Sequence, residues 1–324
     1  MAEHAVEDED QGSETTIVSF GETLWDLLPT GKVLGGAPFN FAYRVKTLGY
    51  ESAMVTQLGA DELGREARQR IEELGMNADY VYESAEYPTG TVEVTLDQDK
   101  NPDYYITPEV AYDYVPLEEE LIELAEEAEC ICYGTLAQRA ATSRETVSRM
   151  LEAFGGRYRL LDINLRKGCW TRESIKHSIA RCDILKLNTE ETPELARTYG
   201  YDVSDVRSCA ERIVKDHGVS YVVVTLGAKG ACAVGSDGSV VLDGAYKVDL
   251  VDPLGSGDAF AAGMVTSLLQ GRSLEEACRR GNAMGAYVAT QRGATEPFTL
   301  DELESFMASH EQARIEDADL AMEP

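Results

Sequence analysis

The stretch that most constrains this chain runs from Asp252 to Gln270 and reads DPLGSGDAFAAGMVTSLLQ. It follows an apolar run that favours a β-strand, Tyr246 to Val251, and its glycine-rich start leads into a helical pattern with an apolar face. Gly271 is placed to end that helix. A glycine turn at a helix N-terminus offers unpaired N–H groups and a partial positive charge, which suit a phosphate. Asp258 is either a favourable first-turn carboxylate or a group with a chemical role.

The rest of the chain alternates between strand and helix patterns. Thr16 to Phe20 and Ala53 to Leu58 are expected strands, and a helix is expected to end at Leu48. Repeated βα units predict a mostly parallel sheet covered by helices on both faces, with ligands at the carboxyl ends of the strands. Thr89 to Leu96 and Asp103 to Thr107 interrupt this rhythm and predict a hairpin outside the main sheet.

These patterns predict one folded domain over residues 15–310, with the hairpin inserted at roughly residues 88–108. Residues 1–14 are polar and acidic and are expected to form a disordered arm. Residues 311–324 are expected to form a second acidic tail.

The formal net charge of −29 is extreme and is spread along the whole chain. Such a surface repels phosphates and argues against a nucleic-acid partner. It fits a host with a salty cytoplasm, where ions screen the self-repulsion; an ordinary acidic enzyme is the alternative. No apolar run is long enough for a membrane helix and the first fifteen residues are acidic, so we expect a cytoplasmic protein without a membrane partner.

The sequence lacks the motifs of several common metal, disulfide and nucleotide sites. The seven cysteines are scattered without C-x-x-C pairs, which favours buried free thiols over zinc or disulfides. The four histidines lack metal-site spacing. There is no G-x-x-x-x-G-K-[ST] sequence, and no glycine fingerprint follows the first strand, which disfavours a nicotinamide-dependent dehydrogenase.

Two stretches carry a resemblance to a known family. Asp252 to Phe260 resembles the D-T-x-G-A-G-D signature of the ribokinase-like (PfkB) carbohydrate kinases, and Gly35 to Asn40 resembles that family's first signature in the form its fructokinases use. The resemblance covers roughly Thr16 to Phe298. It implies an α/β fold, a ribokinase-like three-layer sandwich with a central, mostly parallel sheet and a small β lid.

The resemblance gives the glycine turn a chemical role. It makes Asp258 the general base that takes the proton of the sugar hydroxyl. The N–H groups of Gly255, Ser256 and Gly257 become the anion hole for the γ-phosphate. Phosphoryl transfer needs mainly positioning and charge stabilisation, with a carboxylate within reach of the attacking oxygen, so the residue types agree with these roles.

A possible magnesium site follows the expected strand Ile184 to Leu187. Asn188 and Glu191 match the family's N-x-x-E, which organises Mg²⁺, usually through water. Asn followed three residues later by Glu is also a capping box. Thr192 and Pro193 form a good N-cap and first helical position, which would leave Asn188 to Glu191 before the helix.

Four residues resemble the nucleotide side of the family. Thr225, Gly227 and Gly230 match the loop near the ATP phosphates and ribose, although the stretch alone reads as a plain hairpin. Asn282 falls where the family lines the adenine pocket, although a polar residue on a helix is usually only solvated.

The sugar side of the resemblance involves Asp26, with Gly36 and Asn40 beside it. Carboxylate and amide groups suit the hydroxyls of a polyol. Arg166, in the run D-x-N-x-R that starts at Asp162, would face phosphate or a sugar oxygen; the alternative is a surface ion pair. The hairpin resembles the family's lid, whose strands often pair between subunits, so a homodimer through the lid is a reasonable expectation.

Two positions depart from the family pattern. Pro253 replaces the usual threonine, which removes a hydroxyl and a backbone donor and leaves a K⁺ requirement open. Ser256 replaces the usual alanine but keeps the backbone N–H.

The resemblance implies an ATP- and Mg²⁺-dependent sugar kinase that phosphorylates a primary hydroxyl, with D-fructose to fructose 6-phosphate as the leading reaction. Other acceptors within the class are 2-keto-3-deoxygluconate, ribose, tagatose and a nucleoside. The alternative from another class is a catalytically silent member that acts as a sugar sensor or assembly component.

The charge of the chain makes a direct prediction about salt. Because screening relieves self-repulsion, the melting temperature should rise between low and molar KCl. Thermal denaturation at a series of KCl concentrations measures this, and a melting curve without stabilisation would contradict the salty-cytoplasm hypothesis.

Overall fold

The computed structural model describes residues 15–28, 31–96, 102–203 and 205–315. The expected arm at residues 1–14, the tip of the hairpin at residues 97–101 and the tail residues 316–324 lie outside the described residues.

A nine-stranded sheet forms the centre of the molecule, in the order β13-β12-β11-β10-β9-β8-β1-β4-β5. Neighbouring strands are parallel from β11 to β5, and β12 is antiparallel to both β11 and β13. The sheet is therefore mostly parallel, as predicted. The strands are β1 (Thr16–Phe20), β4 (Glu51–Gly59), β5 (Val81–Ser84), β8 (Cys130–Tyr133), β9 (Tyr158–Asp162), β10 (Ile184–Asn188), β11 (Tyr221–Thr225), β12 (Gly230–Gly235) and β13 (Val240–Gly244).

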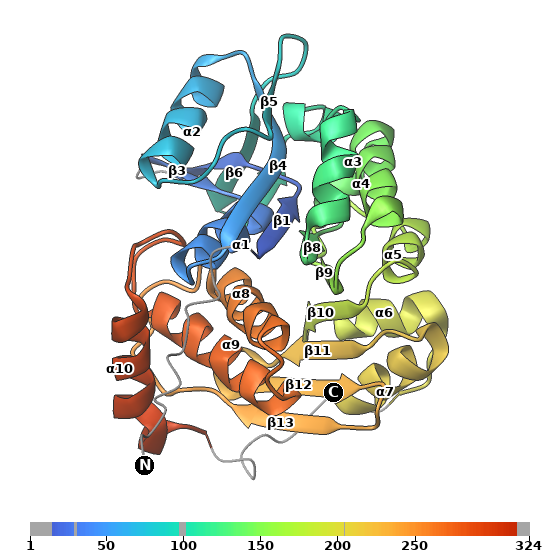
Figure 1. The fold of residues 1–324 in the computed structure, drawn as a ribbon, viewed down its shortest axis with the longest axis vertical. Coiled ribbons are helices and arrows are strands. Elements are labelled where there is room, and N and C mark those ends of the chain that lie inside the picture. The colour runs from blue at the N-terminus through green and yellow to red at the C-terminus, as the bar shows by residue number, and fades with distance from the viewer. Residues whose placement is uncertain (1–14, 29–30, 97–101, 204, 316–324) are drawn as a thin grey trace, which may run out of the picture.

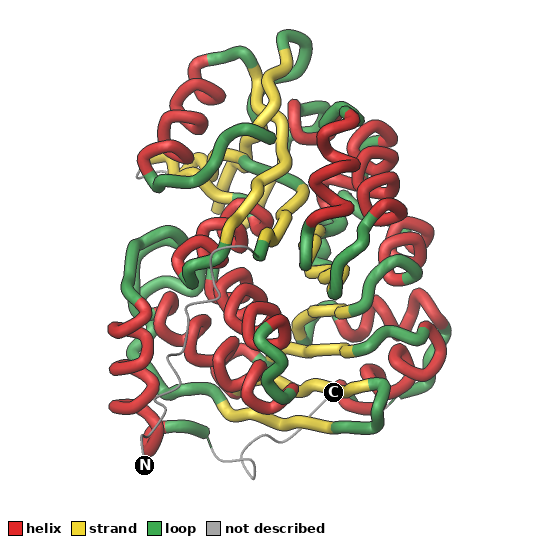
Figure 2. Tube along the Cα trace, viewed as in Figure 1, coloured by secondary structure: helices red, strands yellow, loops and turns green. Residues whose placement is uncertain are grey.

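Helices cover both faces of this sheet, which gives the three layers expected from the sequence (Figures 1 and 2). Helices α1, α8, α9 and α10 lie on one face, and α3 to α7 lie on the other. Their bounds are α1 (Ala37–Thr47), α2 (Glu62–Glu73), α3 (Glu119–Glu127), α4 (Ala141–Ala153), α5 (Arg172–Ile179), α6 (Thr192–Tyr199), α7 (Val206–His217), α8 (Ser256–Leu269), α9 (Leu274–Ala289) and α10 (Leu300–His310).

The strands supply two separate cores because successive side chains point to opposite faces of the sheet. Ile17 and Ile184 pack under α1, α8 and α9, whereas their neighbours Val18 and Leu185 pack against the helices of the other face. All four side chains are fully buried. Near-continuous apolar strands of this kind are what a parallel sheet covered on both sides requires.

The lid is a separate four-stranded sheet in the order β3-β2-β6-β7, made of β2 (Leu24–Leu28), β3 (Gly31–Gly35), β6 (Gly90–Leu96) and β7 (Pro102–Ile106). The predicted hairpin is confirmed as the antiparallel pair β6 and β7. The sequence did not indicate that β2 joins this sheet, where it runs parallel to β6 and antiparallel to β3.

Helix α8 is buried on more sides than the single apolar face expected from its sequence. Every residue from Ala259 to Leu268 is buried, and the helix lies between α1 and α9. A Cβ on Gly263 would stand 2.7 Å from Met284, and one on Gly281 would stand 2.9 Å from the Phe260 ring. Small residues therefore let α9 approach closely, and this packing holds the start of α8 in place.

The last described residues pair with Ala245 to Lys247, which directly follow β13. The Ile315 N–H donates to the Ala245 carbonyl (2.9 Å) and the Lys247 N–H donates to the Ala313 carbonyl (3.2 Å). Tyr246 and Arg314 form an antiparallel bridge. The first residues of the expected tail are therefore anchored to the sheet.

The seven cysteines are free thiols and six of them are buried, as expected. No described helix combines the length and the apolar character that a bilayer crossing needs. Within the described ranges, no cluster of three or more His, Cys, Asp or Glu side chains could hold a metal ion.

Asp61 joins α2 to the lid and should be important for stability. Its carboxylate accepts hydrogen bonds from the Gly64 N–H (2.7 Å), the Thr89 N–H (2.8 Å) and the Thr89 hydroxyl (2.7 Å). Burial alone would raise the pKa of Asp61, but these hydrogen bonds lower it. A lowered pKa stabilises the folded state above the ordinary pKa of aspartate, and this contribution is lost as the pH falls through the folded-state value.

We therefore expect Asp61→Ala to lower the free energy of unfolding at pH 7 by roughly 1–3 kcal/mol. Urea denaturation at fixed KCl measures this. The control is Asp202→Ala, which removes an exposed aspartate. Equal stability of the two variants would contradict the role of Asp61.

Candidate active site

The carboxyl ends of four parallel strands carry the polar groups of the site. Glu22 follows β1, Asp162 ends β9, Asn188 ends β10 and Thr225 ends β11. This edge of an open parallel sheet is where α/β proteins bind ligands.

The glycine turn predicted at Gly255 to Gly257 is present at the start of α8. Gly255 is the N-cap residue with φ +76°, and a Cβ on it would stand 2.4 Å from the Ala294 Cβ, so only glycine fits there. The Ser256 N–H already donates to the Pro253 carbonyl (3.2 Å). Gly257 and Asp258 complete the first helical turn, whose N–H groups have no partner further back along a helix.

Asp258 is held by Asn40 from the opposite end of the chain. The Asn40 side-chain amide donates to the Asp258 carboxylate (2.8 Å). Asn40 is 4% exposed, and its amide oxygen has no hydrogen-bond partner within the described residues. The two predicted signatures thus meet in one site, because α1 packs directly against α8.

The environment of Asp258 raises the pKa of its carboxyl to about 6. Burial is the largest cause, and the negative charge of Asp162 adds to it. Lys186, the hydrogen bond from Asn40 and the charge of Arg166 act in the opposite direction. A carboxyl of this strength is mostly ionised near neutral pH and can still take up a proton, as a general base must.

The positive charge of Arg166 acts on Asp258 and on two more carboxyl groups, those of Glu22 and Asp26. Burial raises the pKa of Glu22 to about 7 and that of Asp26 to about 6, and in both cases Arg166 opposes the rise. Glu22 is 4% exposed, and its Oε2 lacks a hydrogen-bond partner within the described residues. A Cβ on Gly36 (φ +116°) would stand 2.3 Å from the Glu22 carbonyl oxygen, which explains the glycine at the start of α1.

A small cavity of about 10 Å³ lies between Glu22 and the sheet and is lined also by Pro38, Thr135 and Asp162. This is about the room that one water molecule needs.

Asn188 and Glu191 form a closed set of hydrogen bonds with the backbone. The Asn188 side-chain oxygen accepts from the N–H groups of Glu190 (2.9 Å) and Glu191 (3.0 Å). The Glu191 carboxylate accepts from the N–H groups of Asn188 (2.8 Å) and Leu165 (2.7 Å). The reciprocal bonds have the pattern of a capping box. The sequence suggested Thr192 as the N-cap of α6. In the structure the N-cap is Glu191, because the turn that starts at Asn188 continues directly into the helix.

The predicted loop at Thr225 to Gly230 joins the antiparallel strands β11 and β12, so the hairpin pattern is present. Thr225 is the register partner of Asn188 on the neighbouring strand. Gly227 (φ +59°) and Gly230 (φ +127°) both have positive φ, and a Cβ on Gly230 would stand 2.1 Å from the Asp243 carbonyl oxygen.

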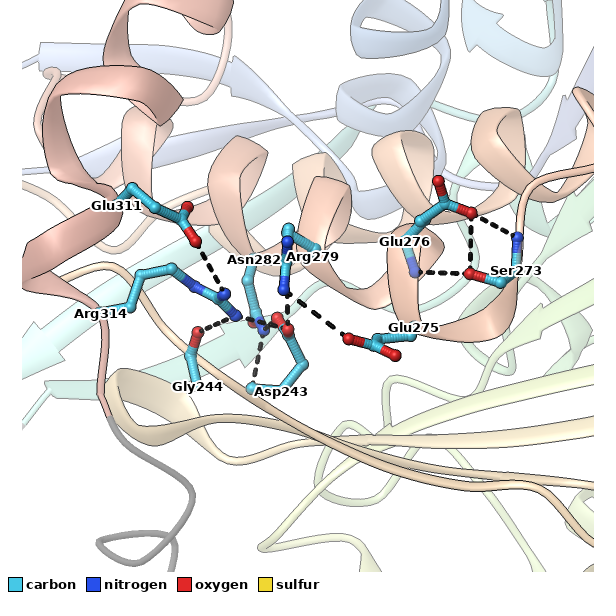
Figure 3. A network of polar contacts seen from close by, with 9 residues as sticks. All are labelled: Asp243, Gly244, Ser273, Glu275, Glu276, Arg279, Asn282, Glu311 and Arg314. Atoms are coloured by element: carbon cyan, nitrogen blue, oxygen red, sulfur yellow. Dashed lines mark hydrogen bonds and ion pairs between the residues drawn. The ribbon is translucent and has the colours of Figure 1, made fainter.

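Asn282 is buried on α9 and is not a solvated surface residue. Its amide nitrogen donates to the carbonyl (2.9 Å) and the carboxylate (2.7 Å) of Asp243 on β13. Arg279 and Arg314 also pair with that carboxylate, which makes it the centre of the network in Figure 3. Asp243 contacts Asn282 and also lies against the backbone of Gly230. The predicted nucleotide residues Asn282 and Gly230 therefore lie in the same region.

The structure therefore joins Asn40 to Asp258 and puts Thr225 beside Asn188. Arg166 is exposed and is linked to Asp258 and Asp26 through its charge. Sequence reasoning missed Glu22, and it missed the ion pair of Lys186 with Asp162 that lies next to Asp258. A charged residue inside the otherwise apolar strand Ile184 to Leu187 was the available signal for Lys186.

Comparison with known proteins shows the family of this chain. The family model of the pfkB family carbohydrate kinases matches residues 14–301. Fructokinase-1 of Oryza sativa subsp. japonica is 31% identical over 87% of this chain and 94% of its own length. The aminoimidazole riboside kinase of Salmonella typhimurium is 29% identical over 91% of this chain and 95% of its own length.

The fold is also that of a solved fructokinase from Vibrio cholerae, a double mutant with fructose, ADP and a potassium ion bound. That structure is 23% identical in sequence, covers 91% of this chain and 99% of its own, and superimposes with a TM-score of 0.77. The chain belongs to the pfkB family of carbohydrate kinases. The family, the ribokinase-like fold and the enzyme class expected from the sequence are confirmed.

The raised pKa of Asp258 predicts a cost to stability. Above pH 6 the folded protein must hold a buried ionised carboxylate, whereas near pH 4 this carboxyl is protonated and the cost disappears. We expect Asp258→Asn to be more stable than the wild type at pH 8, by roughly 1–3 kcal/mol, and to lose most of this advantage near pH 4.

Thermal or urea denaturation at both pH values tests this. Asp202→Asn is the control for removing one negative charge from an acidic protein, since Asp202 is exposed. A wild type that is more stable than Asp258→Asn at pH 8 would contradict the prediction.

Proposed function

We propose that this protein transfers the γ-phosphate of ATP to a primary hydroxyl of a neutral sugar, with D-fructose as the acceptor and fructose 6-phosphate as the product. The observation that carries the proposal is the Asp258 carboxyl, which Asn40 holds in the first turn of α8 directly after the glycine turn. It combines a base of suitable strength with N–H groups that suit a phosphate.

In the proposed reaction Asp258 takes the proton of the attacking hydroxyl. The N–H groups of Gly255 and Gly257 stabilise the charge on the transferred group. The Ser256 N–H can join them only by giving up its hydrogen bond to the Pro253 carbonyl. Thr225, Gly227, Gly230 and Asn282 are the proposed nucleotide residues.

Mg²⁺ would supply charge neutralisation on the phosphates when it is bound. The Asn188 side-chain oxygen already accepts two N–H groups, so it does not fit as a direct ligand. Within the described residues, each oxygen of the Glu191 carboxylate accepts one backbone N–H, which leaves it a lone pair for a magnesium-bound water. Asn188 then acts by holding Glu191 in place.

The charges of the site favour a neutral acceptor. Glu22, Asp26 and Asp258 all lie within the electrostatic reach of Arg166, which favours the ionised form of each carboxyl group. An acceptor with its own carboxylate, such as 2-keto-3-deoxygluconate, would add a negative charge to this group. The hydroxyls of fructose, tagatose, ribose or a nucleoside can instead donate to the carboxylates. The likeness to the aminoimidazole riboside kinase keeps a nucleoside acceptor in consideration.

A coupled ADP-release assay with ATP and Mg²⁺ in molar KCl tests the proposal across fructose, glucose, ribose, tagatose, 2-keto-3-deoxygluconate and adenosine. We expect turnover on fructose and weak or no turnover on 2-keto-3-deoxygluconate. Asp258→Asn should bind ATP but lose turnover by roughly 10²–10⁴-fold. Preference for another neutral acceptor would keep the kinase and change its substrate, whereas ATP binding without turnover on any acceptor would favour a sugar sensor.

A further inference from the structure

A lysine occupies the middle of the apolar strand β10. Its neighbours Leu185 and Leu187 are buried in the core on one face of the sheet. Lys186 points to the other face, which it shares with Ile184 and which α8 covers. Its side chain is 8% exposed, and its ammonium group donates to the Asp162 carboxylate at 2.7 Å.

This ion pair lies against the first turn of α8. A Cβ on Gly257 would stand 3.3 Å from the Lys186 Nζ, so the ammonium group lies beside the residue that precedes Asp258. Lys186 favours the ionised form of Asp258, and Asp162 disfavours it. The two charges of one pair therefore act on the proposed base in opposite directions.

Stability does not explain a buried pair at this position. Removing two charges from water is costly, and replacing a buried ion pair by apolar residues is often neutral or stabilising. The other residues of β10 up to Leu187 are apolar, so the strand would accept such residues. The ammonium group also has three N–H donors, of which Asp162 takes one.

We propose that Lys186 and Asp162 act together as a positioning pair, in which Lys186 keeps the Asp258 carboxylate charged and Asp162 holds Lys186 in place and limits its effect. The proposal rests on the proposed role of Asp258 as the base. Neither residue is proposed to touch the acceptor.

Other groups also face Asp258. They are Asn40 and Arg44 on α1, Glu22 after β1, Cys132 on β8 and Arg166 after β9. All of them are unchanged in variants of Lys186 and Asp162, so a change in the titration of Asp258 would report on the pair.

The test is a double-mutant cycle with Lys186→Met, Asp162→Asn and the two combined. The first readout is the titration of Asp258 itself, followed by carbon-13 NMR of protein labelled at the aspartate carboxyl carbon. The Asp258 resonance is identified by its loss in Asp258→Asn. This readout needs no acceptor. The second readout is the pH profile of kcat/KM with the best acceptor, since activity is lost as the pH falls and the base becomes protonated.

We expect opposite shifts from the two single variants. Lys186→Met should raise the pKa of Asp258 by roughly one unit, because a cation is lost. Asp162→Asn should lower it by roughly one unit, because the charge of Lys186 is no longer offset. The double variant should return close to the wild type, and the acid limb of the pH profile should move with each shift.

The matched control is the ion pair of Arg159, near the amino end of β9, with Asp183, which directly precedes β10. Asp183→Asn should leave the titration of Asp258 unchanged. If Lys186→Met does not fold, Asp162→Asn carries the test, and Lys186→Arg should keep the Asp258 pKa within a few tenths of a unit because the positive charge remains.

Equal titration of Asp258 in the wild type and Asp162→Asn, or shifts of the same sign in both single variants, would overturn the pairing. The failure of the proposed function looks different. In that case Asp258→Asn retains turnover, or no acceptor is phosphorylated, whatever the titration shows.

Discussion

The hydrogen bond between Asn40 and Asp258 connects side chains that are 218 residues apart in the sequence. It can form only because α1 and α8 begin at the same place on the sheet, each behind a glycine whose φ is positive. Gly36 lets α1 start against the backbone of Glu22, and Gly255 lets α8 start against Ala294. The starts of α1 and α8 thus depend on two glycine positions at which a side chain would not fit.

Around this hydrogen bond the protein holds several acidic groups with few cations. Arg166 acts on three of the carboxyl groups, and Lys186 is paired with Asp162. Concentrating negative charge in a buried site lowers the stability of the fold, and such strain is typical of functional sites. Burial, with the negative charge of Asp162 added to it, raises the pKa of Asp258 and so makes its carboxylate a stronger base than an ordinary aspartate.

Much of this architecture could be predicted from the sequence, because strand and helix periodicities, glycine stops and the two signatures are local signals. The helix stop at Gly271 and the hairpin of β6 and β7 are examples. The sequence did not reveal that Trp25 on β2 pairs with Thr91 on β6, since LWDLL lacks regular alternation and its partner lies far along the chain. The role of Glu22 was hidden for a similar reason, because its environment is made by Ala37, Arg166 and Asp258. Local patterns located the elements, whereas the electrostatics of the site arise from contacts between distant segments.

The pairing of residues Ala313 to Ile315 with the continuation of β13 has a consequence for the sheet as a whole. β13 is the outermost strand on its side, and an open strand edge is a template on which a second chain can add its own strand. The chain's own Ile315 and Ala313 occupy the hydrogen-bonding groups of Ala245 and Lys247, and Arg314 covers Gly244. The last described residues therefore occupy the edge where β13 ends, at residues Gly244 to Lys247, so a strand of a neighbouring molecule cannot pair there.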